Sequence, residues 1–347
     1  MVNLKSAWFV PLLAAAVLAY PAQEAKRFEK RDESFSTVPS QRFAIFAPKV
    51  VIISMFVSEQ DVWLEPYCLK NNISIPGLSP LYPYIHCDSD YEVCQVTVGE
   101  GGFNAAATTA ALVLNPLFDF TKTFFMIAGI AGINPYEGTI GSATFARFAR
   151  FAVEALGEYP TSLYGTEVFE LNADSDTAKI YRALYNYAPA NQPSKAVKCD
   201  AAASEVWFTG SDLAESFGNF TALMTNGMGH YCATANEDNA TLGALLRAAL
   251  AKLVDFGRIV VMRTASNFDR SPPSTANDAV YGLLYANVGA FDTSLENLVL
   301  AGSPFVNDVI KNWEKYNDGR YAPKNYIGDI FGTLGGTPDF GPYGVAN

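Results

Sequence analysis

The sequence has 347 residues, of which 50% are hydrophobic and 17% are charged, so the chain can bury a sizeable core and does not have the composition of a disordered protein. Its 35 acidic and 24 basic residues give a net charge of −11, which argues against nucleic-acid binding because phosphate contacts need a basic face. Only two histidines, His86 and His230, are available for a metal site or a catalytic triad. We therefore expect no metal and no cofactor.

The N-terminus has the pattern of a secretory signal peptide. Lys5 precedes an uncharged, mostly apolar run from Ala7 to Tyr20, which is too short to span a bilayer, and small residues place cleavage near Ala19. Residues 1–19 are therefore predicted to be a signal peptide, with an uncleaved anchor as the alternative. This leader predicts a secreted or cell-wall protein.

Residues 20–42 are polar and contain the dibasic pairs Lys26-Arg27 and Lys30-Arg31, so we expect this segment to be processed or disordered. Loss of residues 1–31 would leave 19 basic and 33 acidic residues and a net charge of −14. No later segment reaches 18 consecutive apolar residues, so we expect no membrane span in the mature chain.

Hydrophobic patterning predicts alternating strands and helices from residue 43 onward. The predicted strands are Lys49–Phe56, Thr123–Ala128, Ala222–Thr225 and Arg258–Arg263, with a hairpin formed by Tyr84–Cys87 and Val93–Val98. The predicted helices are Phe103–Leu114, Asp174–Tyr187, Glu237–Asp255 and Leu295–Tyr316. This alternation predicts one α/β domain over residues 43–347, with a mainly parallel sheet and a ligand site at the carboxyl ends of its strands.

Two polar segments follow predicted strands in the first third of the domain. Glu59 lies in Ser58–Asp61, directly after the first strand, where a carboxylate is well placed to act as a general base. The alternative is an ordinary acid in the first turn of the next helix. Gly99–Gly102 opens a helix, so its N–H groups either face a polar ligand or form a tight turn.

Three later segments complete the set of candidates. The glycines of Gly129–Pro135 either let backbone approach a ligand or form a plain turn. Asn236–Asn239 begins a helix, and Arg263–Arg270 follows the next strand. Their carboxylates and amides suit sugar hydroxyls and a base edge, whereas helix capping and a surface ion pair are the alternative.

Four segments together resemble the fungal purine nucleoside permease family: Gly129–Pro135, Thr225–Cys232, Glu237–Ala240 and Arg263–Arg270. The resemblance covers residues 40–340. That family is in turn similar to the nucleoside phosphorylase and nucleosidase superfamily, which implies a three-layer α/β/α sandwich with a mixed central sheet. Its implied ligand is a purine nucleoside, and a homo-oligomer is compatible with it.

The resemblance also implies roles for individual residues. Glu59 corresponds to the acid that activates water, and Glu237 to the acid that holds the ribose hydroxyls. Asn104 matches the helix after the glycine loop, while Gly129, Ala131 and Gly132 match a glycine turn of the site. Ser266 and Asn267 correspond to a Ser-Asp pair whose Asp protonates the leaving base.

Asn267 departs from that pattern because an amide has no titratable proton. Either Asn267 contacts the purine edge and Asp269 acts as the acid, or the site binds nucleosides without chemistry. A phosphorylase needs cations for its anionic nucleophile, and the loop after the first strand offers Glu59 and Asp61 instead. The sequence thus favours a nucleosidase that uses water. A non-catalytic binding or transport component, a phosphorylase, and a storage or interaction protein remain as alternatives.

The five cysteines allow two disulfide bonds and one free thiol. We predict a bond between Cys199 and Cys232, whereas Cys87 and Cys94 either bridge the hairpin or one of them pairs with Cys68. The sequence also has three potential N-glycosylation sites, and we expect the third to be unused because a glycan there would crowd the pocket. They are Asn72, Asn219 and Asn239.

Overall fold

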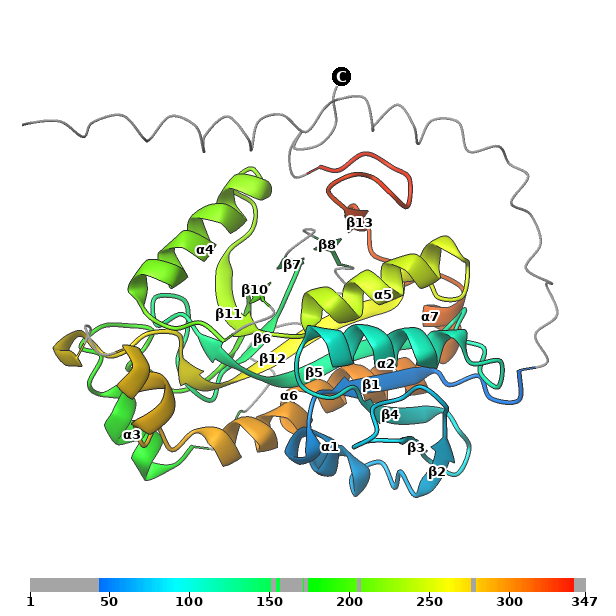
Figure 1. Ribbon diagram of the computed structural model, residues 1–347, viewed down its shortest axis with the longest axis horizontal. Coiled ribbons are helices and arrows are strands. Elements are labelled where there is room, and N and C mark those ends of the chain that lie inside the picture. The colour runs from blue at the N-terminus through cyan, green and yellow to red at the C-terminus, as the bar shows by residue number, and fades with distance from the viewer. Residues whose placement is uncertain are drawn as a thin grey trace, which may run out of the picture. The chain divides into compact units, whose positions relative to one another are not determined.

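The computed structural model describes residues 44–150, 154–156, 171, 174–204, 207–275 and 279–339 (Figure 1). These residues all belong to one compact unit, Phe43–Asn347. The predicted signal peptide (1–19) and the processed or disordered segment (20–42) lie outside the described residues, so both stay predictions.

One mixed sheet connects all the strands that the described residues form. Its order is β13-β8-β7-β10-β11-β5-β1-β4-β3-β2, with β12 pairing both β5 and β6, and β6 pairing β9. The strands are β1 (Val50–Ser54), β2 (Asn71–Ser74), β3 (Tyr84–Cys87), β4 (Val93–Thr97), β5 (Phe124–Ile133), β6 (Ala143–Phe145), β7 (Phe148–Arg150), β8 (Glu154–Ala155), β9 (Ala196–Lys198), β10 (Asp200–Ala203), β11 (Tyr231–Ala235), β12 (Ile259–Phe268) and β13 (Gly328–Asp329). Strands β4, β1, β5 and β12 are parallel neighbours, whereas β11 runs antiparallel to β5.

Helices cover both faces of this sheet (Figure 1). They are α1 (Val57–Leu64), α2 (Gly102–Leu114), α3 (Asp176–Arg182), α4 (Ser211–Met224), α5 (Asp238–Leu250), α6 (Phe291–Lys311) and α7 (Trp313–Asn317), with a π-helical turn over Tyr281–Tyr285. In the described part of the chain, none of the helices combines the length and hydropathy needed to cross a bilayer.

The central strands are apolar on both faces because each face has its own helical layer. Val51 and Ile53 of β1 pack in the core that contains α2 and α5, whereas Val50 and Ile52 pack in the core that contains α1 and α6. The result is a helix–sheet–helix sandwich with a mixed central sheet, which confirms the predicted fold class.

The structure corrects two predicted elements. Gly129–Gly132 is not a turn after the strand, because β5 continues through it to Ile133 and β12 pairs alongside. Ala222–Thr225 is not a strand, because it lies at the C-terminal end of α4. A run of four residues cannot distinguish a strand from part of a helix, and the neighbouring turns of α4 decide the outcome.

Candidate functional site

A cavity of about 710 Å³ opens where the carboxyl ends of β1, β5 and β12 meet the antiparallel strand β11. A parallel α/β sheet places ligand sites at this edge. Seven of the predicted site residues line the cavity: Glu59, Ala131, Gly132, Glu237, Ser266, Asn267 and Asp269. Their sequence separation of more than 200 residues shows that the fold, and not local sequence, brings them together.

Glu59 is in the first turn of α1, yet its carboxylate reaches back to the sheet. Its two oxygens accept hydrogen bonds from the backbone N–H groups of Met55 and Ile130, each at 2.7 Å. The side chain is only 1% exposed. Burial raises the pKa of Glu59 to about 7, against the opposing effect of the Arg263 guanidinium. A carboxyl group with that pKa exchanges its proton near neutrality, as a general base must.

Arg263 is the second charged group at the base of the cavity, and it is 2% exposed. It forms an ion pair with Asp238, donates from Nη1 to the carbonyl of Ile130 at 3.1 Å, and lies 3.6 Å from Glu237. Arg263 begins the candidate segment Arg263–Arg270, in which only the carboxylates and amides were predicted to contact a ligand. An arginine that interrupts the apolar run of a buried strand is the signal that could have identified it, because such a charge needs a partner.

Gly129 does not line the cavity, but it makes room for the two charged groups. A Cβ atom at this position would lie 2.5 Å from Nη1 of Arg263 and 2.7 Å from Oε1 of Glu59. Such distances are shorter than van der Waals contact, so any side chain would displace one or both groups. The glycine is therefore required by close packing, and its conformational freedom is secondary.

Glu237 lies at the N-cap position of α5 and is 5% exposed. Its Oε1 accepts a hydrogen bond of 2.9 Å from the backbone N–H of Gly101, at the N-terminus of α2. Burial raises the pKa of Glu237, and Arg263 opposes that rise. The predicted glycine loop Gly99–Gly102 thus binds a carboxylate of the protein itself.

Ser266 and Asn267 lie at a β-bulge, where the pairing of β12 with β5 shifts register between Ala265 and Asn267. A bulge re-aims the side chains that follow it. The Ser266 hydroxyl donates to the carbonyl of Ala131 at 3.2 Å, and the Thr234 hydroxyl of β11 accepts from the N–H of Gly132 at 3.0 Å. Asn267 lines the cavity and pairs with Gly132 of β5.

Asp269 also lines the cavity, but its carboxylate already accepts three hydrogen bonds from two residues. It accepts from Arg270 at 2.7 and 3.0 Å and from the Tyr231 hydroxyl at 2.7 Å. Its backbone carbonyl accepts from Gly210 and Thr209, in the loop that precedes α4. Burial raises the pKa of Asp269, while Arg270 opposes that rise. These contacts favour a carboxylate that positions Arg270 and Tyr231. The role of Asp269 as the proton donor stays a prediction.

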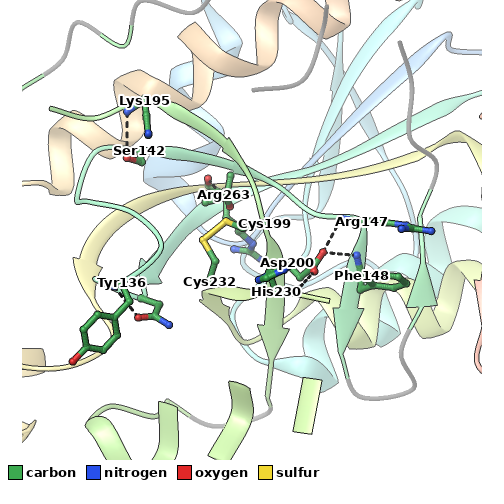
Figure 2. Close-up of a disulfide and its surroundings, with 12 residues drawn as sticks. Tyr136, Ser142, Arg147, Phe148, Lys195, Cys199, Asp200, His230, Cys232 and Arg263 are labelled. Atoms are coloured by element: carbon green, nitrogen blue, oxygen red, sulfur yellow. Dashed lines mark hydrogen bonds between the residues drawn. A yellow bond between two sulfur atoms is a disulfide. The ribbon is translucent and has the colours of Figure 1, made fainter. Parts of the chain in front are cut away.

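A disulfide bond joins Cys199, directly before β10, to Cys232 of β11, the strand that also contributes Thr234 and Ala235 to the cavity (Figure 2). Beside it, Asp200 accepts backbone hydrogen bonds from Arg147, Phe148 and His230, which joins β7, β10 and β11. The side chain of His230 is exposed and does not line the cavity.

Of the other three cysteines, two lie in the hairpin of β3 and β4, and Cys68 lies between α1 and β2. A second disulfide bond joins Cys87 to Cys94 across β3 and β4, and Cys68 is a free, exposed thiol.

Comparison with known proteins places this chain in a family. The sequence profile described as purine nucleoside permease matches residues 47–155 and 148–320. A purine nucleoside permease of Candida albicans is 45% identical over 344 residues, covering 86% of this chain and 84% of the relative. A probable purine nucleoside permease of Schizosaccharomyces pombe is 36% identical over 322 residues, covering 78% and 91%.

Solved structures with similar folds include a 5′-methylthioadenosine/S-adenosylhomocysteine nucleosidase of Colwellia psychrerythraea in complex with adenine. It is 18% identical to this chain, the match covers 76% of this chain and 95% of the nucleosidase, and the TM-score is 0.45. A futalosine hydrolase of Helicobacter pylori is 13% identical, the match covers 77% of this chain and 98% of the hydrolase, and the TM-score is 0.42. The family itself rests on the sequence matches: this chain belongs to the purine nucleoside permease family.

Proposed function

We propose that this protein binds purine nucleosides in its cavity and hydrolyses their N-glycosidic bond with water. The observation that carries the proposal is Glu59, a buried carboxyl group with a pKa of about 7 at the base of a cavity of about 710 Å³. The family name supplies the substrate class, and the position of Glu59 supplies the chemistry.

In this mechanism, Glu59 takes a proton from a water molecule as the water oxygen forms a bond to C1′ of the ribose. The C1′–N bond breaks, and its electron pair leaves with the purine. Glu237 accepts hydrogen bonds from the ribose hydroxyls, which strengthen as positive charge develops on the sugar. The amide of Asn267 donates to an acceptor on the purine edge as negative charge develops there.

The charges at the base of the cavity favour water over phosphate as the nucleophile. Among the described residues that line the cavity, Arg263 is the only cationic one. Its guanidinium is already paired with Asp238 and lies close to Glu237. A phosphate dianion would therefore enter beside carboxylates with no unpaired cation to bind it.

The test is a panel of purine nucleosides incubated with the purified protein, with and without phosphate. We expect free base and free ribose to appear at the same rate in both conditions. Strict dependence on phosphate would establish the phosphorylase alternative. Tight binding without turnover, by both the native chain and a Glu59→Gln variant, would establish a non-catalytic binding or uptake component.

We also propose that the protein acts outside the cytoplasm. The signal-peptide pattern of residues 1–19 and the two disulfide bonds support this, because such bonds persist in oxidising compartments. Expression of the full chain in a yeast host, followed by N-terminal sequencing of the protein in the medium, tests it. We expect a chain that begins after residue 19, and full-length protein in the cytosol would contradict the proposal.

A further inference from the structure

The helices that begin at the cavity share one property: each has an acidic residue in its first turn or binds one at its N-terminus. A helix N-terminus favours anions, and nucleotide-binding proteins commonly use it to hold phosphate. Here the first turns of α1, α5 and α6 contain Glu59, Asp238 and Asp292. The N-terminus of α2 donates to Glu237. The N-terminus of α2 is thus bound by a carboxylate of the protein, and the other three helices each have an acidic residue in the first turn.

The cavity as a whole is strongly acidic. The described residues that line it include five carboxylates, Glu59, Glu100, Glu237, Asp269 and Asp292, and one cation, Arg263. Arg263 is paired with Asp238, and Arg270, which does not line the cavity, is paired with Asp269. Glu100 and Asp292 are exposed, so they lie at the open side of the cavity, where their charge meets an entering ligand first.

We propose that this site selects nucleosides against nucleotides by charge, with Glu100 and Asp292 at the rim as specificity determinants. A 5′-phosphate carries up to two negative charges into a site that is lined by five carboxylates and has no unpaired cation among its described lining residues. The inference rests on the proposed function for its substrate class. It also implies that hydrolysis of a phosphomonoester must come first when nucleotides are the source of the substrate.

The experiment measures binding of inosine and adenosine, and of their 5′-monophosphates, in a Glu59→Gln background that prevents turnover. We expect the monophosphates to bind roughly 100-fold more weakly, because like charges in a partly desolvated site repel strongly. Raising the salt concentration should reduce the ratio of the dissociation constants of monophosphate and nucleoside, because salt screens the charges of Glu100 and Asp292 at the exposed rim. A neutral 5′-O-acetyl nucleoside controls for size and should bind much like the parent nucleoside.

Glu100→Gln combined with Asp292→Asn should narrow the nucleoside-to-nucleotide ratio by roughly ten-fold, since each change removes one repulsive charge. The matched control is Asp176→Asn combined with Glu314→Gln, which removes two exposed first-turn acids from helices outside the cavity and should leave the ratio unchanged.

Equal binding of nucleotides and nucleosides would overturn the inference, as would rejection of the acetyl ester as strong as that of the phosphate. Selective binding without any turnover by the native chain would refute the proposed hydrolysis and leave the selectivity in place. Failure of every nucleoside to bind would refute both.

Discussion

Glu59 and Asp269 are both buried acids that line the same cavity, yet their surroundings differ. The carboxylate of Glu59 accepts two backbone N–H groups, from Met55 and Ile130, and the nearby guanidinium of Arg263 is paired elsewhere. The carboxylate of Asp269 is bound by Arg270 through two hydrogen bonds and by the hydroxyl of Tyr231. One acid lacks a cation of its own, and the other has one.

The different surroundings favour different roles for the two acids: proton transfer for Glu59, and positioning of neighbouring side chains for Asp269. A carboxylate without a dedicated cation gains and loses a proton near neutrality when burial raises its pKa, as for Glu59. A carboxylate in a bidentate pair with arginine would lose those contacts on protonation. We therefore expect changes at Glu59 to affect turnover, and changes at Asp269 to affect binding and stability.

Glu59→Gln gives the largest expected effect. The amide cannot accept a proton from water, so kcat should fall roughly 10³-fold, within the range of general-base contributions. Nucleoside binding, measured by calorimetry, should change only a few-fold. The matched control is Glu65→Gln, the same change at an exposed position at the C-terminal end of α1, which should leave kcat unchanged. Normal turnover by the Glu59 variant would remove this residue from the mechanism.

Gly129→Ala should be the next most damaging change. The added Cβ atom would lie 2.5 Å from Nη1 of Arg263 and 2.7 Å from Oε1 of Glu59, so the catalytic carboxylate must move. A displacement of about 1 Å at a reacting group costs on the order of 10²-fold in kcat/KM. Gly243→Ala is the control, because its Cβ would meet only the tip of Arg247 at 3.2 Å. Equal kinetics for both variants would show that the site tolerates this displacement.

Asp269→Asn should lower kcat/KM less than either change above, chiefly through KM. The variant leaves Arg270 without its carboxylate, which costs roughly 3 kcal/mol of stability for a broken buried pair. Chemical denaturation and steady-state kinetics measure the two effects. A fall in kcat as large as that of Glu59→Gln, together with loss of the alkaline limb of the pH profile, would instead identify Asp269 as the proton donor.

On turnover, the smallest expected effect is the pH dependence of kcat/KM near neutrality. Glu59 must be ionised to act as a base, so kcat/KM should rise with pH and reach half its maximum near pH 7, which is the raised pKa of this group. The same shift has a consequence for stability. Because the folded state binds the Glu59 proton more tightly than the unfolded state, the free energy of unfolding should fall as pH rises from about 4.5 to 7.

The size of that stability effect follows from the shift, and is up to about 3 kcal/mol. Subtracting the pH dependence of Glu59→Gln from that of the native protein isolates it. An acid limb of kcat/KM centred near pH 4.5 would contradict a raised pKa at Glu59.

The sequence was sufficient for features that depend on local patterning or on a family motif. The apolar run before Glu59 predicted a buried strand followed by an acid, and the helix-start pattern placed Glu237 correctly at the beginning of α5. The alternation of strands and helices predicted an α/β domain, and the family resemblance implied the three-layer sandwich.

The features that it did not predict depend on tertiary contacts. β5 continues through Gly129–Gly132 because β12 pairs alongside, and the sequence near these residues contains no pattern that predicts this pairing. The pairing of Arg263 with Asp238 joins residues 25 positions apart. The short strands from β6 to β10 are three or four residues long at most, which is too little pattern to read.

The central claim is that Glu59 activates water, and turnover in ¹⁸O-enriched water with phosphate present at high concentration tests it most directly. Our account predicts free ribose that contains one ¹⁸O atom at C1′, formed by the native protein and nearly lost in Glu59→Gln. Ribose 1-phosphate as the product, or labelled ribose formed equally fast by the variant, would contradict it.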